Sequence, residues 1–265
     1  MTKQEIQFVR SLADKRNRDQ EQLFIAEGDK LISEIAASGL KVRNIYALEG
    51  HLSGKAEVVS AKEMERISQL KTAASSLAVV EQPRHKTPST APADKLSIAL
   101  DGVQNPGNLG TIIRLADWFG VEDIFCSEDC ADCFNPKVVQ ATMGAILRVR
   151  VHYLPLADFL ARSAKEGTPV YGTMLDGDNI YSAELRPTGV IVMGNEGKGV
   201  SAECAKSFTH KLLIPSYPPE RQGSESLNVA MATGIVPRST SSGLPTWMDA
   251  SPAYSSHEAS IPDTR

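Results

Sequence analysis

The stretch SIALDGVQNPGNLGTIIRLADWFG, residues 97–120, decides the fold class of this chain. An apolar segment over 97–103 leads into a turn of Gly, Asn and Pro, and the apolar spacing after the turn predicts a helix over 110–119. The alternation of strand, turn and helix continues to residue 236, and strands such as 189–194 are apolar almost without interruption. Strands of this kind are buried on both faces, as in a parallel sheet covered by helices. We therefore predict an α/β fold with a parallel sheet for residues 91–236.

The rest of the chain divides into a smaller unit, a linker and a tail. Residues 1–90 predict a small α/β unit that begins with a helix running out into a basic loop. The segment 82–92 is rich in Pro, Ser and Thr and has no apolar period, so we interpret it as the linker. Residues 237–265 are expected to form an irregular or disordered tail, because Pro237 disfavours helix in the residue before it. We expect strands at 24–26, 44–48, 57–60, 76–81, 97–103, 123–127, 149–153, 170–175, 189–194 and 211–215, and helices at 29–38, 61–70, 110–119, 136–147, 156–165, 201–207 and 226–236.

Composition restricts the class of protein. The chain has 265 residues with 28 Lys and Arg against 32 Asp and Glu, a net charge of −4, so any site for a polyanion must be a local patch. Four cysteines are too few for a disulfide framework. We find no apolar run long enough to span a membrane and no apolar core of a secretory signal, which predicts a cytoplasmic protein without a membrane partner.

The first candidate site is the turn Asn105–Arg114. Gly- and Asn-rich turns at the carboxyl ends of parallel strands are where α/β folds bind ligands. Asn108 is expected at or near the start of the following helix. Arg114 stands among apolar residues, so it either pairs with a carboxylate or meets an anion such as phosphate. The residues alone leave both interpretations open.

Two further turns have the same character. MGNEGKGVS, residues 193–201, follows a buried strand and matches neither the dinucleotide-binding nor the P-loop spacing of glycines. The segment 213–216 and the loop 217–225 precede a predicted helix. Ser201 and Ser226 are adequately explained as helix N-caps, and Asn228 falls in the first turn of that last helix.

Two other clusters permit a functional and a structural interpretation. The spacing of Cys126, Cys130 and Cys133 has no clear fourth ligand nearby, so we predict no metal site. The cations near the start of the chain either form a solvated helix end, the commoner case, or a patch that contacts phosphates. These cations are Arg10, Lys15, Arg16 and Arg18.

The three turns, taken together and in this order, resemble the motifs of the SpoU/TrmH-type RNA 2′-O-ribose methyltransferases, which belong to the knotted SPOUT class. The segments are NPGNLGTIIRLADWFG, VIVMGNEGKGVS and LLIPSYPPERQGSESLNVAMATGIV, and the resemblance covers residues 97–236. Residues 1–90 resemble, more loosely, the substrate-binding domain of many members, which has a ribosomal-protein-like fold. The resemblance implies a trefoil knot, a homodimer, S-adenosylmethionine as methyl donor and structured tRNA or rRNA as substrate. Under this hypothesis we expect residues 1–90 to select the RNA, with Arg10, Lys15, Arg16 and Arg18 as candidate phosphate contacts.

The resemblance also implies roles for individual residues. Arg114 matches the catalytic arginine, although a guanidinium is too strongly protonated to be a base, so we expect it to bind the target phosphate or hydroxyl and assist proton removal. A non-catalytic RNA-binding member, or a base-nitrogen RNA methyltransferase, are the alternative hypotheses. Family members usually continue the last helix beyond residue 236 into the dimer contact, which the tail here replaces. The other active-site positions are Asn108, Glu196, Ser226 and Asn228, and the cofactor positions are Thr173, Met193, Gly194, Asn195, Gly197, Ile214 and Leu227.

Overall fold

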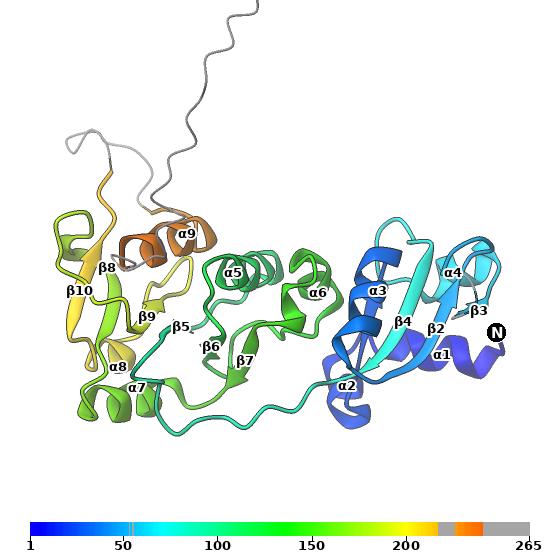
Figure 1. Cartoon of the computed structure of the whole chain (residues 1–265), viewed down its shortest axis with the longest axis horizontal. Helices are drawn as coiled ribbons and strands as arrows, with labels where there is room; N and C mark the ends of the chain where they lie inside the picture. Colours follow the sequence, from blue (N-terminus) through cyan, green and yellow to red (C-terminus); the bar gives the residue numbers. More distant parts are fainter. Residues whose placement is uncertain (53, 55, 217–225, 241–265) are drawn as a thin grey trace, which may run out of the picture.

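Two β-sheets, each with its own apolar core, lie side by side along the molecule (Figure 1). The structure is a computed structural model, and it describes residues 1–52, 54, 56–216 and 226–240, with side chains up to residue 236. We call residues 1–81 the N-terminal unit and residues 96–240 the C-terminal unit. The connecting residues 82–95 contain neither helix nor strand and run along the outside of the molecule.

The C-terminal unit is built on a six-stranded sheet in which every pair of neighbouring strands is parallel, as the uninterrupted apolar strands predict. The strand order is β10-β8-β9-β5-β6-β7. Strand β5 lies between β9 and β6, so the turns that follow β5 and β9 lie next to each other at the carboxyl edge. The strands are β5 (Leu96–Leu100), β6 (Asp123–Cys126), β7 (Arg150–Tyr153), β8 (Val170–Asn179), β9 (Gly189–Met193) and β10 (His210–Leu213).

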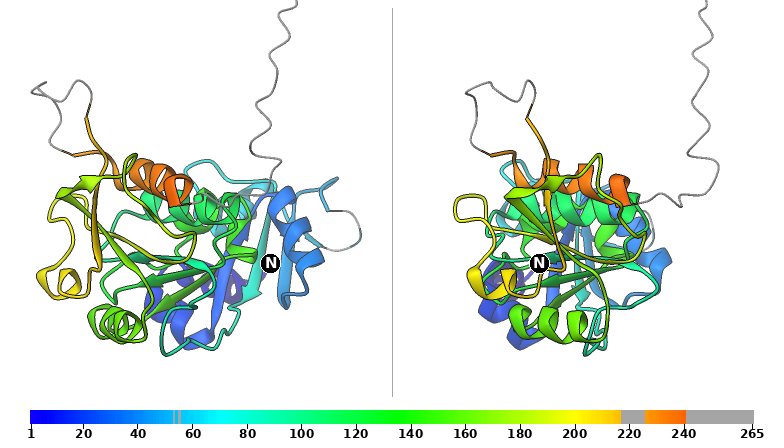
Figure 2. Two further views of the ribbon diagram at one scale, coloured as in Figure 1. Left: turned by 60° about the vertical axis from the view of Figure 1, so that its left-hand side comes forward. Right: turned by 90° about the vertical axis from the view of Figure 1, so that its left-hand side faces the viewer.

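Helices cover both faces of this sheet (Figure 2). On β9, Ile191 and Met193 face a core shared with α5 and α9, whereas Val190 and Val192 face a second core shared with α7 and α8. The alternation of side chains along each strand explains why both faces are apolar. The helices are α5 (Pro106–Trp118), α6 (Pro136–Ala141), α7 (Leu156–Lys165), α8 (Ala202–Ala205) and α9 (Val229–Thr240), with a 3₁₀ turn at Ala145–Leu147.

The N-terminal unit has a four-stranded sheet in the order β1-β4-β2-β3, with β4 antiparallel to both of its neighbours. Its α3 begins after Gly28 and ends at Ser38, as the sequence predicts. A capping box formed by Ser60 and Glu63 starts α4. The elements are α1 (Lys3–Ser11), α2 (Lys15–Glu21), β1 (Leu23–Glu27), α3 (Asp29–Ser38), β2 (Val42–Ala47), β3 (Glu57–Val58), α4 (Ala61–Ile67) and β4 (Ser76–Glu81).

Three expectations about helices were wrong. The basic stretch after the first helix is not a loop but α2, which the side chain of Asp14 caps. The helix expected over 136–147 is broken by Met143 and Gly144, both at positive φ (52° and 91°). The last helix begins at Val229 and continues past Pro237 to Thr240, because a proline removes one hydrogen bond without forbidding the turn that follows. Residues 241–265 of the expected tail lie outside the described residues.

Candidate functional site

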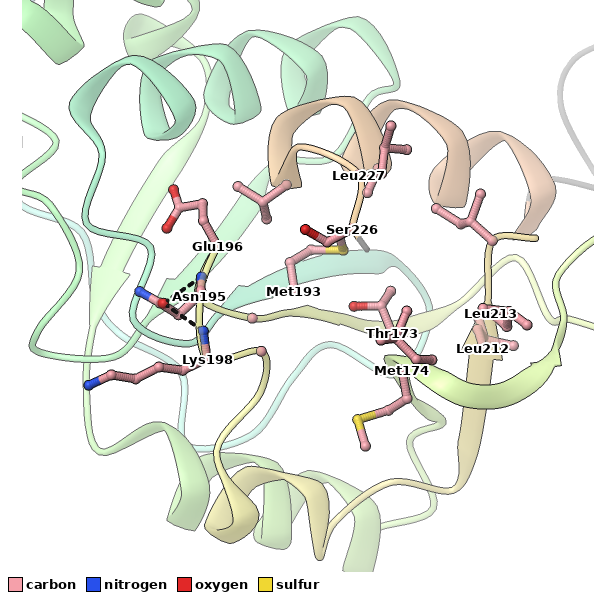
Figure 3. A pocket seen from close by; sticks show the side chains of 17 residues that line it. Thr173, Met174, Met193, Asn195, Glu196, Lys198, Leu212, Leu213, Ser226 and Leu227 are labelled. Atoms are coloured by element: carbon pink, nitrogen blue, oxygen red, sulfur yellow. Dashed lines mark hydrogen bonds between the residues drawn. The ribbon is translucent and has the colours of Figure 1, made fainter. Parts of the chain in front are cut away.

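The second and third turns singled out in the sequence line one cleft of about 380 Å³ at the carboxyl edge of the large sheet (Figure 3). The first turn does not line the cleft and is joined to the second turn by hydrogen bonds. The volume of the cleft lies within the range of small-molecule sites. Every residue that the resemblance assigns to the cofactor lines this cleft, and so do Glu196 and Ser226. The cofactor positions are Thr173, Met193, Gly194, Asn195, Gly197, Ile214 and Leu227.

The start of α5 is organised by two asparagines with different tasks. Asn105 is the N-cap, and its Oδ1 accepts hydrogen bonds from the backbone N–H of Gly107 (2.8 Å) and Asn108 (3.3 Å). Pro106 occupies the first helical position, where no backbone donor is needed. Because Asn105 caps the helix, the side chain of Asn108 is free to face the other two turns.

The second turn, 194–199, is folded back on itself. Asn195 Oδ1 accepts from the backbone N–H groups of Gly197 (2.9 Å) and Lys198 (3.0 Å), while Asn195 Nδ2 donates to the carbonyl of Gly102 (2.7 Å). A Cβ at Gly194 would overlap the backbone of Gly199, so only glycine fits there. These bonds attach the second turn to the first and leave backbone groups along the cleft.

A chain of side-chain hydrogen bonds joins all three turns. Asn108 Nδ2 donates to Glu196 Oε1 (2.6 Å), and Asn228 Nδ2 donates to Asn108 Oδ1 (3.2 Å). Asn228 also caps α9, since its Oδ1 accepts from the backbone N–H of Ala230 and Met231. Asn228 therefore takes the capping role that the sequence suggested for Ser226, which is exposed at the cleft. In Figure 3, Glu196 extends toward α5 and α9, whereas Lys198 points away.

Arg114 lies on the exposed flank of α5, two turns after the cap. Within the described ranges, no side chain or backbone group pairs with its guanidinium. Of the two interpretations that the sequence left open, the structural salt bridge is therefore wrong for the described part of the chain. An exposed guanidinium without a protein partner can bind phosphate.

The lining of the cleft suits S-adenosylmethionine, the cofactor that the resemblance implies. Its floor carries no side chain at Gly194, Gly197 and Gly199, where a flat or extended ligand can approach the backbone. Its rim is apolar, with Leu175 77% and Leu227 52% exposed, which suits the adenine ring. Thr173 Oγ1 donates to the carbonyl of Val192 (2.9 Å), which holds β8 against β9 beside the cleft.

The cations near the start of the chain do not form one patch. Arg18 is 1% exposed, and it donates to Asp132 Oδ2 from Nε (3.0 Å) and Nη2 (2.5 Å). The expectation that Arg18 contacts RNA was wrong, since a buried guanidinium with bound acceptors is a structural group. Lys15 pairs with Asp19 on the surface, and Arg10 and Arg16 are exposed.

The sequence interpretation missed residues that shape the cleft. Asp101 Oδ2 accepts from the backbone N–H of Ser201 (2.7 Å) and so joins the first two turns. Its signal was present, because an acidic residue directly follows an apolar strand. Met174, Leu213 and Val229 also line the cleft, but apolar residues at strand and helix ends carry no distinctive signal.

The three clustered cysteines have structural surroundings. Cys130 Sγ accepts from the backbone N–H of Val103 (3.3 Å) and contacts the carbonyl of Leu100 (3.2 Å). A hydrogen bond from Cys126 lowers the pKa of Cys130 to about 7, and burial raises the pKa of Cys133 to about 12. Over the described ranges, no group of three or more His, Cys, Asp or Glu side chains is placed to hold a metal ion. Nor does any helix there combine the length and apolarity needed to cross a membrane.

Comparison with known proteins gives a consistent pattern. Residues 95–237 match the model of the SpoU rRNA Methylase family, and residues 3–85 match that of the MRM3-like substrate binding domain. The 23S rRNA (guanosine(2553)-2′-O)-methyltransferase RlmP of Bacillus subtilis is 30% identical over 241 residues, which cover 88% of this chain and 94% of the relative. The 23S rRNA (guanosine-2′-O-)-methyltransferase RlmB of Pseudomonas aeruginosa is 34% identical over 143 residues, 53% of this chain and 56% of RlmB, so only about half of that relative is matched.

Solved structures share the same architecture. A protein of the TrmH family from Porphyromonas gingivalis superposes with a TM-score of 0.81 at 38% identity, over 91% of this chain and 98% of that one. The AdoMet-bound rRNA methyltransferase from Sinorhizobium meliloti superposes with a TM-score of 0.78 at 27% identity, over 91% and 95% of the two chains.

Proposed function

This chain belongs to the SpoU rRNA methylase family, and from that premise we propose that it transfers a methyl group from S-adenosylmethionine to a ribose 2′-hydroxyl of ribosomal or transfer RNA. The observation that carries the proposal is a cleft lined by the second and third turns, to which the hydrogen bonds of Asn108 with Glu196 and Asn228 join the first turn. RlmP and RlmB, which are similar to this chain, are named as 2′-O-methyltransferases of 23S rRNA. A related structure at 27% identity holds AdoMet.

S-adenosylmethionine, when bound, supplies a methyl group that is already electrophilic because its sulfur is positively charged. The backbone along Gly194 and Gly197 and the side chains of Ile214 and Leu227 would hold it in the cleft. Thr173, Met193 and Asn195 would shape the wall behind it. The task of the protein's own residues is then to align the ribose and to help remove its proton.

We assign that task to the polar side chains around the cleft. Arg114 would bind the phosphate beside the target ribose, supported by its exposure and by its lack of a partner among the described residues. Asn108, Glu196 and Asn228 would orient the hydroxyl through their shared hydrogen bonds. Ser226, exposed at the cleft, would contact the RNA backbone.

We further propose a division of labour in which residues 1–90 select the RNA and residues 91–236 carry out the transfer. The match of residues 3–85 to a substrate binding domain supports it. Arg10, Lys15 and Arg16 remain as candidate phosphate contacts because their side chains are exposed. Ribosomal RNA, the substrate named for the relatives, also supports a cytoplasmic location.

We propose that the active protein is a homodimer and that its chain is knotted. The support for a dimer is that the adjacent helices α5 and α9 expose large apolar side chains, Trp118 (76%) and Met231 (63%). Helix α9 also continues past residue 236 to Thr240, where the resemblance implies a helix that takes part in the dimer contact. Sedimentation of the full chain tests the dimer, and a monomer contradicts it. An experimental structure that traces residues 217–225 tests the knot.

The test of the function uses the full chain, S-adenosylmethionine with a labelled methyl group, and ribosomal RNA from cells that lack this gene. We expect calorimetry to show binding of S-adenosylmethionine, and digestion of the product RNA to yield one 2′-O-methylated nucleoside. Absence of cofactor binding would instead favour the non-catalytic RNA-binding alternative. Label on a base nitrogen would favour the base methyltransferase.

A further inference from the structure

One segment of the C-terminal unit contacts both the candidate site and the N-terminal unit. We call residues 127–134, which follow β6, the bridge segment. At its start, Ser127 Oγ accepts from the backbone N–H of Gly102 (2.8 Å), and the backbone N–H of Ala131 donates to the carbonyl of Val103 (2.9 Å). These bonds hold the bridge segment against the turn that leads into α5. Cys130, whose Sγ also accepts from Val103, makes the same attachment from inside the core.

The other end of the bridge segment is fixed to the N-terminal unit by a buried ion pair. Asp132 Oδ2 accepts two hydrogen bonds from Arg18, whose Nη1 donates to the carbonyls of Leu12 (2.8 Å) and Ala13 (2.7 Å). The side chains of Arg18 and Asp132 are 1% and 12% exposed. A buried pair of this kind adds little net stability but strongly disfavours any arrangement that separates its partners.

An apolar contact surrounds the ion pair. The rings of Phe134 and Phe24 lie 5.0 Å apart, from the bridge segment and from β1. Val139, 1% exposed, belongs to the apolar cluster of the N-terminal unit, and Leu147 packs against that cluster. Units joined by a linker move relative to each other unless their interface is substantial and apolar. Here an apolar contact and a buried charge pair together favour one fixed arrangement.

A second connection reaches the helix that carries Asn108 and Arg114. Arg148 Nη2 pairs with Asp117 (2.7 Å) in the last turn of α5, and Arg148 Nη1 lies 3.8 Å from Glu34 of α3. Gly144, at positive φ, has no Cβ and so leaves room for the carboxylate of Glu34 beside it. The N-terminal unit is thus connected to both ends of α5, through the turn before this helix and through its last turn.

We propose that the bridge segment fixes the distance between the RNA-selecting surface and the cleft, so that an RNA held by the N-terminal unit presents one particular nucleotide for methylation. Arg18, Asp132 and Phe134 are then positioning residues that set which nucleotide reacts. This inference rests on the proposed function. It differs from a tethered arrangement, in which the unit would only raise the local concentration of RNA.

The test compares Asp132→Asn with Asp19→Asn, because both remove one carboxylate that pairs with a cation of α2. Asp19 is 51% exposed, whereas Asp132 is nearly buried. In D132N the side-chain oxygen can still accept from the backbone N–H of Phe134. Arg18 then faces a neutral amide in place of the carboxylate, so the charge pair is lost. Hydrogen exchange of the full chain is expected to rise at least tenfold in the bridge segment, α2 and β1 of D132N, and to stay unchanged in β8 and β9.

Activity supplies the second readout, with S-adenosylmethionine and ribosomal RNA from cells that lack the gene. For D132N we expect the KM for RNA to rise about tenfold, methylation to spread to neighbouring nucleotides, and kcat and cofactor affinity to stay within twofold. For D19N, which only frees Lys15 on the surface, we expect kcat, cofactor affinity and the methylated nucleotide to match the wild type and the KM for RNA not to rise. Phe134→Ala should repeat the D132N pattern, and it replaces D132N if that variant does not fold.

Two results would overturn the proposal. If exchange rises at the bridge segment but the RNA KM and the methylated nucleotide do not change, the bridge joins the units without positioning RNA. If neither D132N nor F134A changes exchange there, the bridge does not hold the units together. If the wild-type protein methylates no RNA, the proposed function fails, while the exchange experiment still decides whether the units form one rigid body.

Discussion

Arg18 and Arg114 were both expected to meet RNA, and the fold treats them in opposite ways. Arg18 is buried between the two units and donates to Asp132 and to two backbone carbonyls. Arg114 lies exposed on α5 and has no partner among the described residues. A buried guanidinium has to be matched by acceptors, or its desolvation would cost more than folding can supply. An exposed guanidinium has no such requirement and is available to a ligand.

The comparison teaches how the role of a cation can be recognised. Each guanidinium nitrogen of Arg18 has an acceptor that the chain itself supplies, so the role of Arg18 is to fix the arrangement of the units. Arg114 has none among the described residues, which is why we propose it as the cation that binds RNA. Substitutions of buried groups should therefore change stability, and substitutions of exposed groups should change RNA binding or methyl transfer.

Replacing Arg18 with alanine is expected to lower the free energy of unfolding by about 3 kcal/mol, because it leaves a buried carboxylate and two carbonyls without their donor. Urea unfolding measures the loss. Changing both partners, Arg18→Met with Asp132→Leu, should recover most of it, since no charge is then left buried. A loss below about 1 kcal/mol for the single variant would mean that the pair is not buried in solution.

Asn108 and Asn105 lie at the start of the same helix, but Asn108 joins the turns of the site whereas Asn105 caps the helix. Asn108→Ala should lower the rate of methyl transfer about a hundredfold, because the hydrogen bonds to Glu196 and Asn228 are lost. Asn105→Ala should lower stability by about 1 kcal/mol through the lost helix cap. The rate of methyl transfer and the thermal unfolding of both variants measure these two effects. Equal losses of rate would show that Asn108 acts only through the helix.

The sequence predicted the three turns and most elements for a clear physical reason. Gly and Asn at the ends of apolar strands mark places where the backbone turns sharply, and such places are local in sequence. The partner of Arg18 could not be predicted, because Asp132 lies 114 positions away and in a different unit. The break at Met143 was missed because positive φ is rare in a side chain of that kind. The course of α9 past Pro237 was missed because packing against α5 outweighs the local cost of proline.

Asp123 is a further buried charge, and its contribution to the free energy of unfolding depends on pH. Burial alone would raise the pKa of Asp123, but hydrogen bonds from Arg150 and His152 outweigh it, so the pKa lies below the ordinary 3.8. A lowered pKa in the folded state contributes stability above the unfolded value, and this contribution is lost as pH falls through the folded value. Asp123→Asn should therefore cost about 2 kcal/mol near pH 7 and progressively less below about pH 4.

Urea unfolding across this pH range measures the effect, with Glu122→Gln as the control on the neighbouring, exposed carboxylate. The control should change stability little at any pH. A constant difference between wild type and D123N over the whole range would contradict the assigned ionisation.

The smallest effect is expected at the exposed cation Arg16. Arg16→Ala should raise the KM for RNA about threefold and reduce its dependence on salt, because one phosphate contact releases roughly one counterion. Titrations at two salt concentrations measure it. Unchanged salt dependence would remove Arg16 from the proposed RNA surface.

The most direct test of the central claim is single-turnover transfer of a labelled methyl group by Arg114→Ala saturated with S-adenosylmethionine, with Lys165→Ala on the opposite face of the sheet as control. The account predicts that R114A folds and binds the cofactor like the wild type but transfers methyl to the 2′-hydroxyl at least a hundredfold more slowly. Transfer at the wild-type rate by R114A would contradict the claim that this unpaired arginine serves the reaction.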